Sequence, residues 1–236
     1  MKKQLAIIPV FIISLFSPLY SIADEAPVNV SFGASVQPAR WKGENLNGGT
    51  DFETTSSQLQ LNLRIRKEKI YGGLSFQGAE FEFKDGAPNK VNENVSVRDD
   101  DATIKRGEFD LVFGYYFWPK VSLFIDLKSI TNDWKNDGYA VRYNGMGFGV
   151  SGYQPINADW VMFGSIGFVN LDIRADSKSI GDGKGSALVI GALYRINQQV
   201  NFTVSLKSQH NEYDFDEGSE QEHDIGGLVL GFSYSI

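Results

Sequence analysis

The residues of this sequence that could support acid–base or metal chemistry gather near its C-terminus. Its two histidines, His210 and His223, flank an acidic stretch. Glu212, Asp214 and Asp224 lie close to them in the sequence. A symmetric hairpin about this stretch would bring the two histidines near one another across a strand pair. Imidazole beside carboxylate suits a general base or a divalent-metal ligand set, so one hypothesis is a hydrolytic or metal site here.

A solvated polar rim explains the same residues without any chemistry. No serine lies two residues after His210, no Asp-x-His pair occurs, and the chain has no cysteine. A weak metal candidate is the acidic run in which Asp214, Asp216 and Glu220 space oxygen ligands as calcium loops do, but the full calcium-loop pattern is missing. We therefore expect no catalytic residue, no metal, no cofactor and no enzymatic activity.

The elements that must position these residues show a period of two. Near the end of the chain, the small or polar residues Gly231, Ser233 and Ser235 separate a row of large apolar residues. That row consists of Leu228, Leu230, Phe232, Tyr234 and Ile236. Side chains alternate faces along a strand, so this segment predicts a strand with one apolar face and one small, polar face. The pattern recurs from Pro27 onwards and predicts roughly ten strands in total.

The connections between the predicted strands alternate in length. Long polar loops are expected to start at residues 42, 84, 129, 174 and 214, and short turns are expected near residues 67, 118, 155 and 198. Such alternation is typical of membrane β-barrels and is not a feature of soluble sandwiches. In the sixth strand, residues 139–144 have the opposite parity of apolar side chains, which predicts a bulge or a rim there.

Aromatic residues indicate interfacial girdles at two depths of a membrane. One predicted band lies near the short turns and the C-terminus, and the other lies near the long loops. The first band comprises Tyr115, Phe117, Trp118, Tyr153, Trp160, Tyr194 and Tyr234. The second band comprises Trp41, Phe81, Phe83, Trp134 and Tyr139.

The first residues of the chain predict export. Lys2 and Lys3 precede a short apolar run, and residues 21–23 place small side chains where a signal peptidase cleaves. We predict a signal peptide over residues 1–23 and a barrel over residues 24–236. The net charge of -7 and the pI of about 4.9 argue against nucleic-acid binding, because that function needs a basic face.

The polar rows of the predicted strands carry charges of both signs. These predicted lumen-lining residues are Arg64, Arg66, Glu108, Asp110, Asp126, Lys128 and Lys207. Such charges would be costly in a dry core, but in a narrow lumen they can pair with each other and with water. A barrel of about ten strands lies near the closed end of the size range, and mixed signs favour pairing over a selectivity ring. We therefore expect a closed or weakly conducting lumen.

With these strands and turns, the chain resembles the small outer-membrane β-barrel proteins of Gram-negative bacteria, the OmpA-like and opacity-type barrels. Its final strand, GGLVLGFSYSI, resembles the C-terminal signal that the barrel-assembly machinery reads, although such strands usually end in Phe and this one ends in Ile236. The resemblance implies location in the outer membrane, contact with the lipid bilayer and lipopolysaccharide, and help from that machinery during biogenesis.

The sequence thus predicts an all-β fold, a closed antiparallel up-and-down transmembrane β-barrel of about ten strands, with eight or twelve as alternatives. We expect a monomer with a structural or surface-interaction role through long extracellular loops. A narrow porin-like channel for small solutes is the alternative. An outer-membrane hydrolase, in the style of the omptin proteases or lipid A deacylase barrels, is the third reading.

Overall fold

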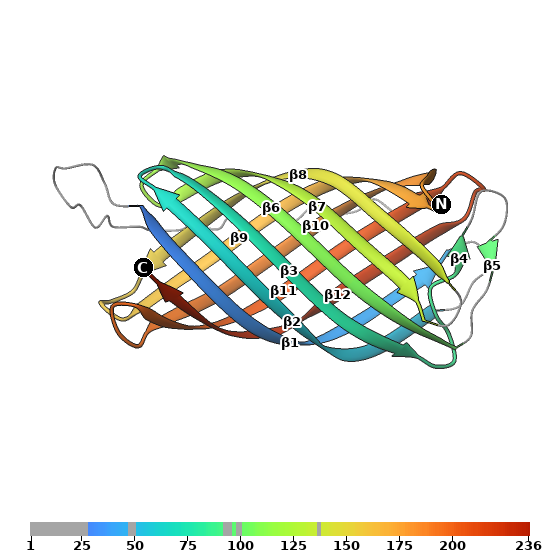
Figure 1. Ribbon diagram of the computed structural model, residues 1–236, viewed down its shortest axis with the longest axis horizontal. Helices are drawn as coiled ribbons and strands as arrows, with labels where there is room; N and C mark the ends of the chain where they lie inside the picture. Colours follow the sequence, from blue (N-terminus) through green and yellow to red (C-terminus); the bar gives the residue numbers. More distant parts are fainter. Residues whose placement is uncertain (1–27, 47–50, 92–95, 98–100, 136–137) are drawn as a thin grey trace, which may run out of the picture.

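The computed structural model describes residues 28–46, 51–91, 96–97, 101–135 and 138–236 (Figure 1). The signal peptide predicted over residues 1–23 lies outside the described residues. The described part of the chain is built from strands, and none of it forms a helix long and apolar enough to cross a membrane.

Ten of the described strands form one closed antiparallel barrel, which confirms the predicted fold class. Each strand pairs with the strands before and after it in the chain, so the topology is up-and-down. The barrel strands are β1 (Asn29–Asn45), β2 (Asp51–Lys67), β3 (Ile70–Phe83), β6 (Ala102–Trp118), β7 (Val121–Trp134), β8 (Tyr139–Pro155), β9 (Trp160–Ala175), β10 (Lys178–Arg195), β11 (Val200–Phe215) and β12 (Glu220–Ser235). The short strands β4 (Lys90–Val91) and β5 (Ser96–Val97) pair with each other in the connection from β3 to β6.

The first and last strands close the barrel at its seam. β1 pairs with β12 along its length, and β1 also pairs with β2. The final residue takes part, because Ile236 N donates to Val30 O at 2.8 Å. A closed sheet leaves no backbone edge, which is the condition for a β-structure to lie in hydrocarbon.

The strands are longer than a membrane requires. They reach 17 residues in β1, β2, β6 and β8 and 18 residues in β10. At about 3.3 Å per residue and a tilt of about 40°, such a strand is roughly 43 Å high, whereas the apolar band of a membrane barrel is only about 25 Å tall. Each strand therefore has a half that lies in the membrane and a half that projects beyond it.

The outer surface of the half nearest the short turns is apolar. We call this half the membrane section. Its outward row includes large side chains that are about half exposed or more, among them Phe32, Leu59, Leu61, Phe76, Phe113, Leu123, Ile125, Met146, Phe148, Phe168, Leu206 and Phe232. In a closed barrel with a polar interior, this band is the surface that lipid covers. The apolar row of the final strand, from Leu228 to Ile236, belongs to the same band.

The projecting half, which we call the collar, has the opposite arrangement. The collar comprises residues 37–45, 51–58, 77–83, 102–108, 128–134, 139–145, 169–175, 178–187, 207–215 and 220–227. Its outward row is polar and charged, and its interior holds a buried hydrophobic cluster that includes Trp41, Phe52, Phe81, Phe83 and Ile104. This is the pattern of a water-soluble barrel, because the collar's outer face meets water and no longer meets lipid.

The inverted collar overturns the predicted second girdle. Trp41, Phe81, Phe83 and Trp134 are 0–2% exposed and lie inside the barrel, and Tyr139 packs against the same cluster. Of the bulge or rim predicted at residues 139–144, the bulge is wrong, because β8 pairs with β7 and β9 without a register shift, and the rim fits, because this segment lies in the collar. The parity of apolar residues reverses there because the strand passes from lipid to water, so the same inward row changes from small residues to Val141 and Tyr143.

The connections at the collar end are mostly shorter than expected. The predicted loops from residues 42, 129, 174 and 214 are largely strand, and β9 and β10 are separated only by Asp176 and Ser177. Both residues have positive φ values, of 48° and 69°, as a two-residue hairpin requires. The polar residues that suggested loops form the outward row of the collar. The connection between β3 and β6 remains long, and the four short turns lie where they were predicted.

Aromatic rings narrow the interior of the membrane section. The ring of Phe124 on β7 lies against Gly149 on β8 and Gly167 on β9, where an added Cβ would meet it. In the same way the ring of Tyr71 lies against Gly114. The inward glycines therefore make room for large rings, and the lumen is narrowed from several sides.

Candidate functional site

A network of buried charges crosses the barrel interior where the collar meets the membrane section. Lys128 on β7 lies at its centre, with a side chain 9% exposed. Its Nζ donates to Glu108 Oε1 at 2.6 Å and also to Asp110 on the same neighbouring strand. Asp126 Oδ2 lies 3.8 Å from the same Nζ. Three carboxylates thus converge on one ammonium group.

Further polar side chains complete this network from other strands. Arg106 Nη2 lies 3.6 Å from Glu108 Oε2, and Arg106 Nη1 donates to Asn132 Oδ1 at 3.0 Å. Gln209 Nε2 on β11 donates to Glu108 Oε1 at 3.1 Å, which links opposite walls of the barrel. In addition, Lys207 Nζ donates to Gln77 Oε1 at 3.0 Å.

The charges of this network balance. Its cations are Arg106, Lys128 and Lys207, and its carboxylates are Glu108, Asp110 and Asp126. A neutral, cross-linked set of side chains stabilises a closed interior and offers no field of one sign to a passing ion. Five of the seven predicted lumen-lining residues lie together in this network.

The hydrophobic cluster of the collar lies directly beyond the charge network. The two layers meet at Arg106, whose Cζ lies 5.3 Å from the ring centre of Trp41. Trp41 in turn has Phe81, Phe83 and His223 around it, with ring centres 5.0 to 5.4 Å apart. An apolar layer of this kind excludes water and ions from the upper interior.

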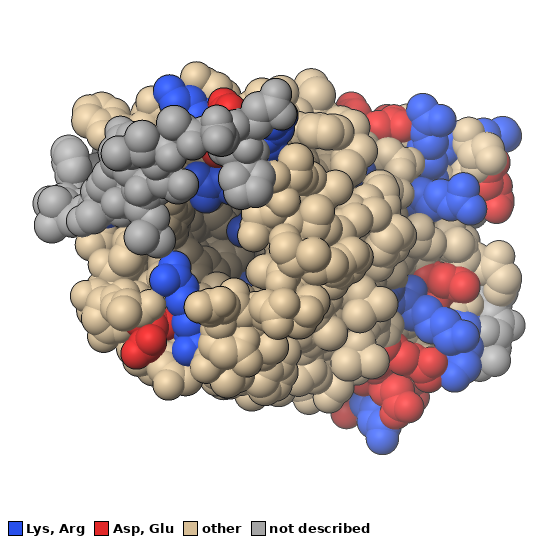
Figure 2. Space-filling view, turned by 60° about the vertical axis from the view of Figure 1, so that its left-hand side comes forward, with Lys and Arg blue, Asp and Glu red and all other residues tan. Residues whose placement is uncertain are grey.

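Arg64 and Arg66 do not join the network, although they share the predicted lumen row with it. Both project from β2 into the interior near the short turns, where Figure 2 shows a hollow with basic side chains along its wall. Arg64 Cζ lies 5.8 Å from the ring centre of Tyr71, and Arg66 Cζ lies 4.5 Å from that of Tyr116. We call this space the turn-end hollow.

The two histidines lie on opposite faces of the barrel, so the predicted proximity is wrong. The register pairs His210 with Asp224 and Asn211 with His223. His223 is fully buried inside, where burial and then Arg106 lower its pKa well below the usual range. His210 lies outside. Burial opposes its protonation, but the hydrogen bonds and negative charges of Asp224 and Glu212 together outweigh burial and raise its pKa. The two imidazoles cannot act on one substrate or share one metal.

The outer face of the collar carries a chain of ion pairs over four strands. Lys184 on β10 lies 2.8 Å from Glu212 on β11, and His210 lies between Glu212 and Asp224 at 3.4 and 2.9 Å. Lys42 on β1 lies 3.4 Å from the second oxygen of Asp224. The residues of this chain are about 40–70% exposed, so they contribute little to stability and mainly keep the collar surface polar.

The acidic run considered for calcium does not assemble a site. Asp214 and Glu220 are a register pair at the β11–β12 hairpin, and Asp216 lies in the turn between them. Among the described residues, no group of three or more histidine and carboxylate side chains could hold a metal ion. The run is therefore part of the polar collar surface.

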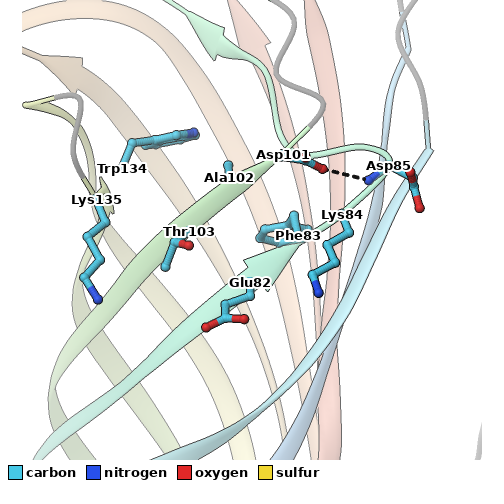
Figure 3. A pocket seen from close by; sticks show the side chains of 9 residues that line it. All are labelled: Glu82, Phe83, Lys84, Asp85, Asp101, Ala102, Thr103, Trp134 and Lys135. Carbon is cyan, nitrogen blue, oxygen red and sulfur yellow. Dashed lines mark hydrogen bonds between the residues drawn. The ribbon is translucent and has the colours of Figure 1, made fainter.

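A groove of about 500 Å³ opens at the collar rim (Figure 3). The residues that line it come from the ends of β3, β6 and β7 and are Glu82, Phe83, Lys84, Asp85, Asp101, Ala102, Thr103, Trp134 and Lys135. Asp85 N donates to Asp101 Oδ1 at 3.2 Å, which ties the two sides of the β3–β6 connection together. The groove carries charges of both signs and belongs to the water-facing part of the molecule.

Several members of the charge network were not predicted from the sequence. Arg106, Gln77, Asn132 and Gln209 are buried polar residues at 0–6% exposure. Arg106 lies two residues before Glu108, so the alternation of β6 could have identified it if that strand had been extended past its apolar row. Gln209 lies two residues after Lys207, in the same inward row of β11.

The comparisons with known proteins concern fold. No protein-family model matches the sequence, and no curated protein matches it. The outer membrane protease OmpT from Escherichia coli is similar in structure, with a TM-score of 0.52 and 10% identity over 89% of this chain and 96% of that one. The beta domain of the Bordetella autotransporter BrkA has a TM-score of 0.47 and 8% identity over 89% of this chain and 100% of that domain. The closed barrel and its likeness to OmpT give the chain the fold of an outer-membrane β-barrel, and they do not distinguish the OmpA-like and opacity-type branch from other barrels.

Proposed function

We propose that this protein is a sealed outer-membrane β-barrel with a structural or surface-interaction role, without enzymatic activity. The observation that carries the proposal is the double closure of its interior. A neutral network around Lys128 and Glu108 fills the barrel at the base of the collar, and the cluster around Trp41 fills the collar itself. An ion crossing this barrel would have to break the network and then enter an apolar layer.

The surface available for interaction is the collar, together with the long connection between β3 and β6, in place of the five long loops that the sequence predicted. The collar is a rigid extension of all ten strands, and its outer face presents the ion pairs around His210 and the rim groove beside Lys135. Lipopolysaccharide is the partner proposed for the lower edge of the collar, and the bilayer is proposed for the apolar band. We further propose that the chain is a monomer of the OmpA-like and opacity-type class and is inserted by the barrel-assembly machinery.

A narrow channel for small solutes is the second candidate. The turn-end hollow favours it, because a polar opening lies at one end of the barrel (Figure 2). A channel would need this opening to continue through the network at Lys128 and through the collar cluster.

Planar-bilayer recording distinguishes the two candidates. Protein whose folding is established by heat-dependent gel mobility is expected to insert without discrete current steps, because both layers block ions. Incorporation is followed independently with antibody or fluorescent label in the same bilayers. Regular steps that grow with salt concentration would contradict the sealed barrel and establish the channel.

A further inference from the structure

The turn-end hollow differs from the rest of the interior in its charge. Among the described strand residues that face inward between the turns and the network, the charged ones are Arg64, Arg66 and Arg195. All three are cations, and the nearest inward carboxylates, Asp110 and Asp126, are already engaged with Lys128. The network is neutral, so these arginines leave the hollow with a net positive charge.

Neither Arg64 nor Arg66 has a carboxylate partner among the described residues. Arg66 Nε donates to the Glu68 carbonyl at 3.1 Å, and the remaining contacts of the two guanidinium groups are the faces of Tyr71 and Tyr116. Stacking on a ring orients a guanidinium group while leaving its N–H donors available at the edge. The two tyrosine rings therefore position the N–H donors of both guanidinium groups.

The exposure of the inward side chains falls from the turns towards the collar. Along the inward row of β2, Arg64 is exposed and Gln60 is partly exposed, whereas Gln58 is only 3% exposed. On the neighbouring strands β1 and β3 the exposure of the inward side chains is low at the same level, where Gln37 and Gln77 are 5% and 6% exposed. The hollow is thus a blind pocket, and its low-dielectric walls strengthen the positive potential inside it.

The tyrosine side of the pocket is itself ordered. Tyr71 OH lies 3.1 Å from Ser122 Oγ, and Ser122 Oγ lies 2.7 Å from Ser151 Oγ. These hydroxyl groups join β3, β7 and β8 across the interior and hold the ring on which Arg64 lies. The arginines therefore face the opening from a fixed wall.

We propose that the turn-end hollow binds a small molecule with two anionic groups, one on Arg64 and the other on Arg66. Successive inward residues of a strand lie roughly 6–7 Å apart, which suits a ligand with two separated anionic groups, such as a dicarboxylate or a diphosphate. Guanidinium groups bind carboxylate and phosphate oxygens through paired N–H donors. The ligand enters from the side of the short turns, which in outer-membrane barrels is the periplasm.

Calorimetric titration of the folded full chain in a non-ionic detergent tests this site. Pyrophosphate and succinate are the two probes, used at about 0.01 M ionic strength, where screening is weak. The variant Arg64→Gln/Arg66→Gln is expected to bind the preferred probe about tenfold or more weakly, because two charge-assisted contacts are lost. Both substitutions lie at the open end, and heat-dependent gel mobility verifies that the variant folds.

The matched control is Lys105→Gln/Arg142→Gln, which removes the same charge from exposed positions on the outer face of the collar. Its affinity is expected to stay within about twofold of the unmodified protein, because distant exposed charges act weakly. Binding of only pyrophosphate or only succinate would support the site and would identify the ligand as a diphosphate or a dicarboxylate. Absence of binding for both probes, or equal loss in the two variants, would overturn the proposal. The titration does not depend on whether the barrel conducts.

Discussion

Replacing Lys128 with alanine is expected to destabilise the folded barrel by about 3–5 kcal/mol, because breaking a buried ion pair leaves uncompensated charge behind. The ammonium group holds Glu108 and Asp110 directly and lies near Asp126. Without it, three carboxylates would face one another in a space that little water enters. Urea unfolding in detergent micelles, followed by tryptophan fluorescence, measures the loss.

Two variants make this prediction specific to the buried network. Lys135→Ala breaks the pair with Glu80, whose side chains are 44% and 39% exposed, and is expected to have a far smaller effect. Glu108→Gln combined with Lys128→Met removes one charge of each sign and should recover part of the stability that Lys128→Ala loses. Equal unfolding midpoints for Lys128→Ala and Lys135→Ala would show that the network does not stabilise the barrel.

Replacing Trp41 with alanine is expected to destabilise the protein by about 3–5 kcal/mol, the cost of a large cavity in a packed core. Trp41 is 0% exposed and packs edge-on against Phe81 and Phe83. Its loss would also remove the ring beneath the Arg106 guanidinium group. The shift in the urea unfolding midpoint, monitored by circular dichroism, gives the magnitude.

The conservative variant Trp41→Phe keeps an aromatic ring in the cluster and should retain most of the stability. The sequence predicted Trp41 in an interfacial girdle. In that position Trp41→Ala would reduce the stability much less, because the ring would be removed from the lipid interface and not from a packed core. A loss below about 1 kcal/mol for Trp41→Ala would therefore contradict the inverted collar.

The strand pattern predicted the barrel but not the boundary at which it inverts. Alternation is a local property, so Phe109 to Phe117 and Leu228 to Ile236 identify strands without further information. Trp41 and Phe81 show the same alternation, yet they face inward, because the solvent outside the barrel has changed from lipid to water. No local sequence pattern shows where the surroundings change from lipid to water. The polar outward residues of the collar were therefore predicted to be loops.

Register explains why the predicted proximity of the two histidines is wrong. His210 and His223 differ by one residue from a direct pair, and a shift of one residue sends side chains to opposite faces. The sequence of β9 does not identify its lipid-facing row, because the side chains of both rows are largely apolar. Its inward residues Val161, Phe163 and Leu171 can be apolar because the interior beside β9 is lined by aromatic rings and glycines.

Site-specific cysteine labelling tests the sealed interior most directly, because the chain contains no native cysteine. Ser35 and Ala39 lie in the same inward row of β1, but Ser35 is partly exposed in the turn-end hollow, whereas Ala39 is 0% exposed in the collar cluster. A charged thiol reagent should modify Ser35→Cys in the folded protein and should modify Ala39→Cys only after denaturation. Labelling of both cysteines at similar rates in the folded state would contradict a closed collar.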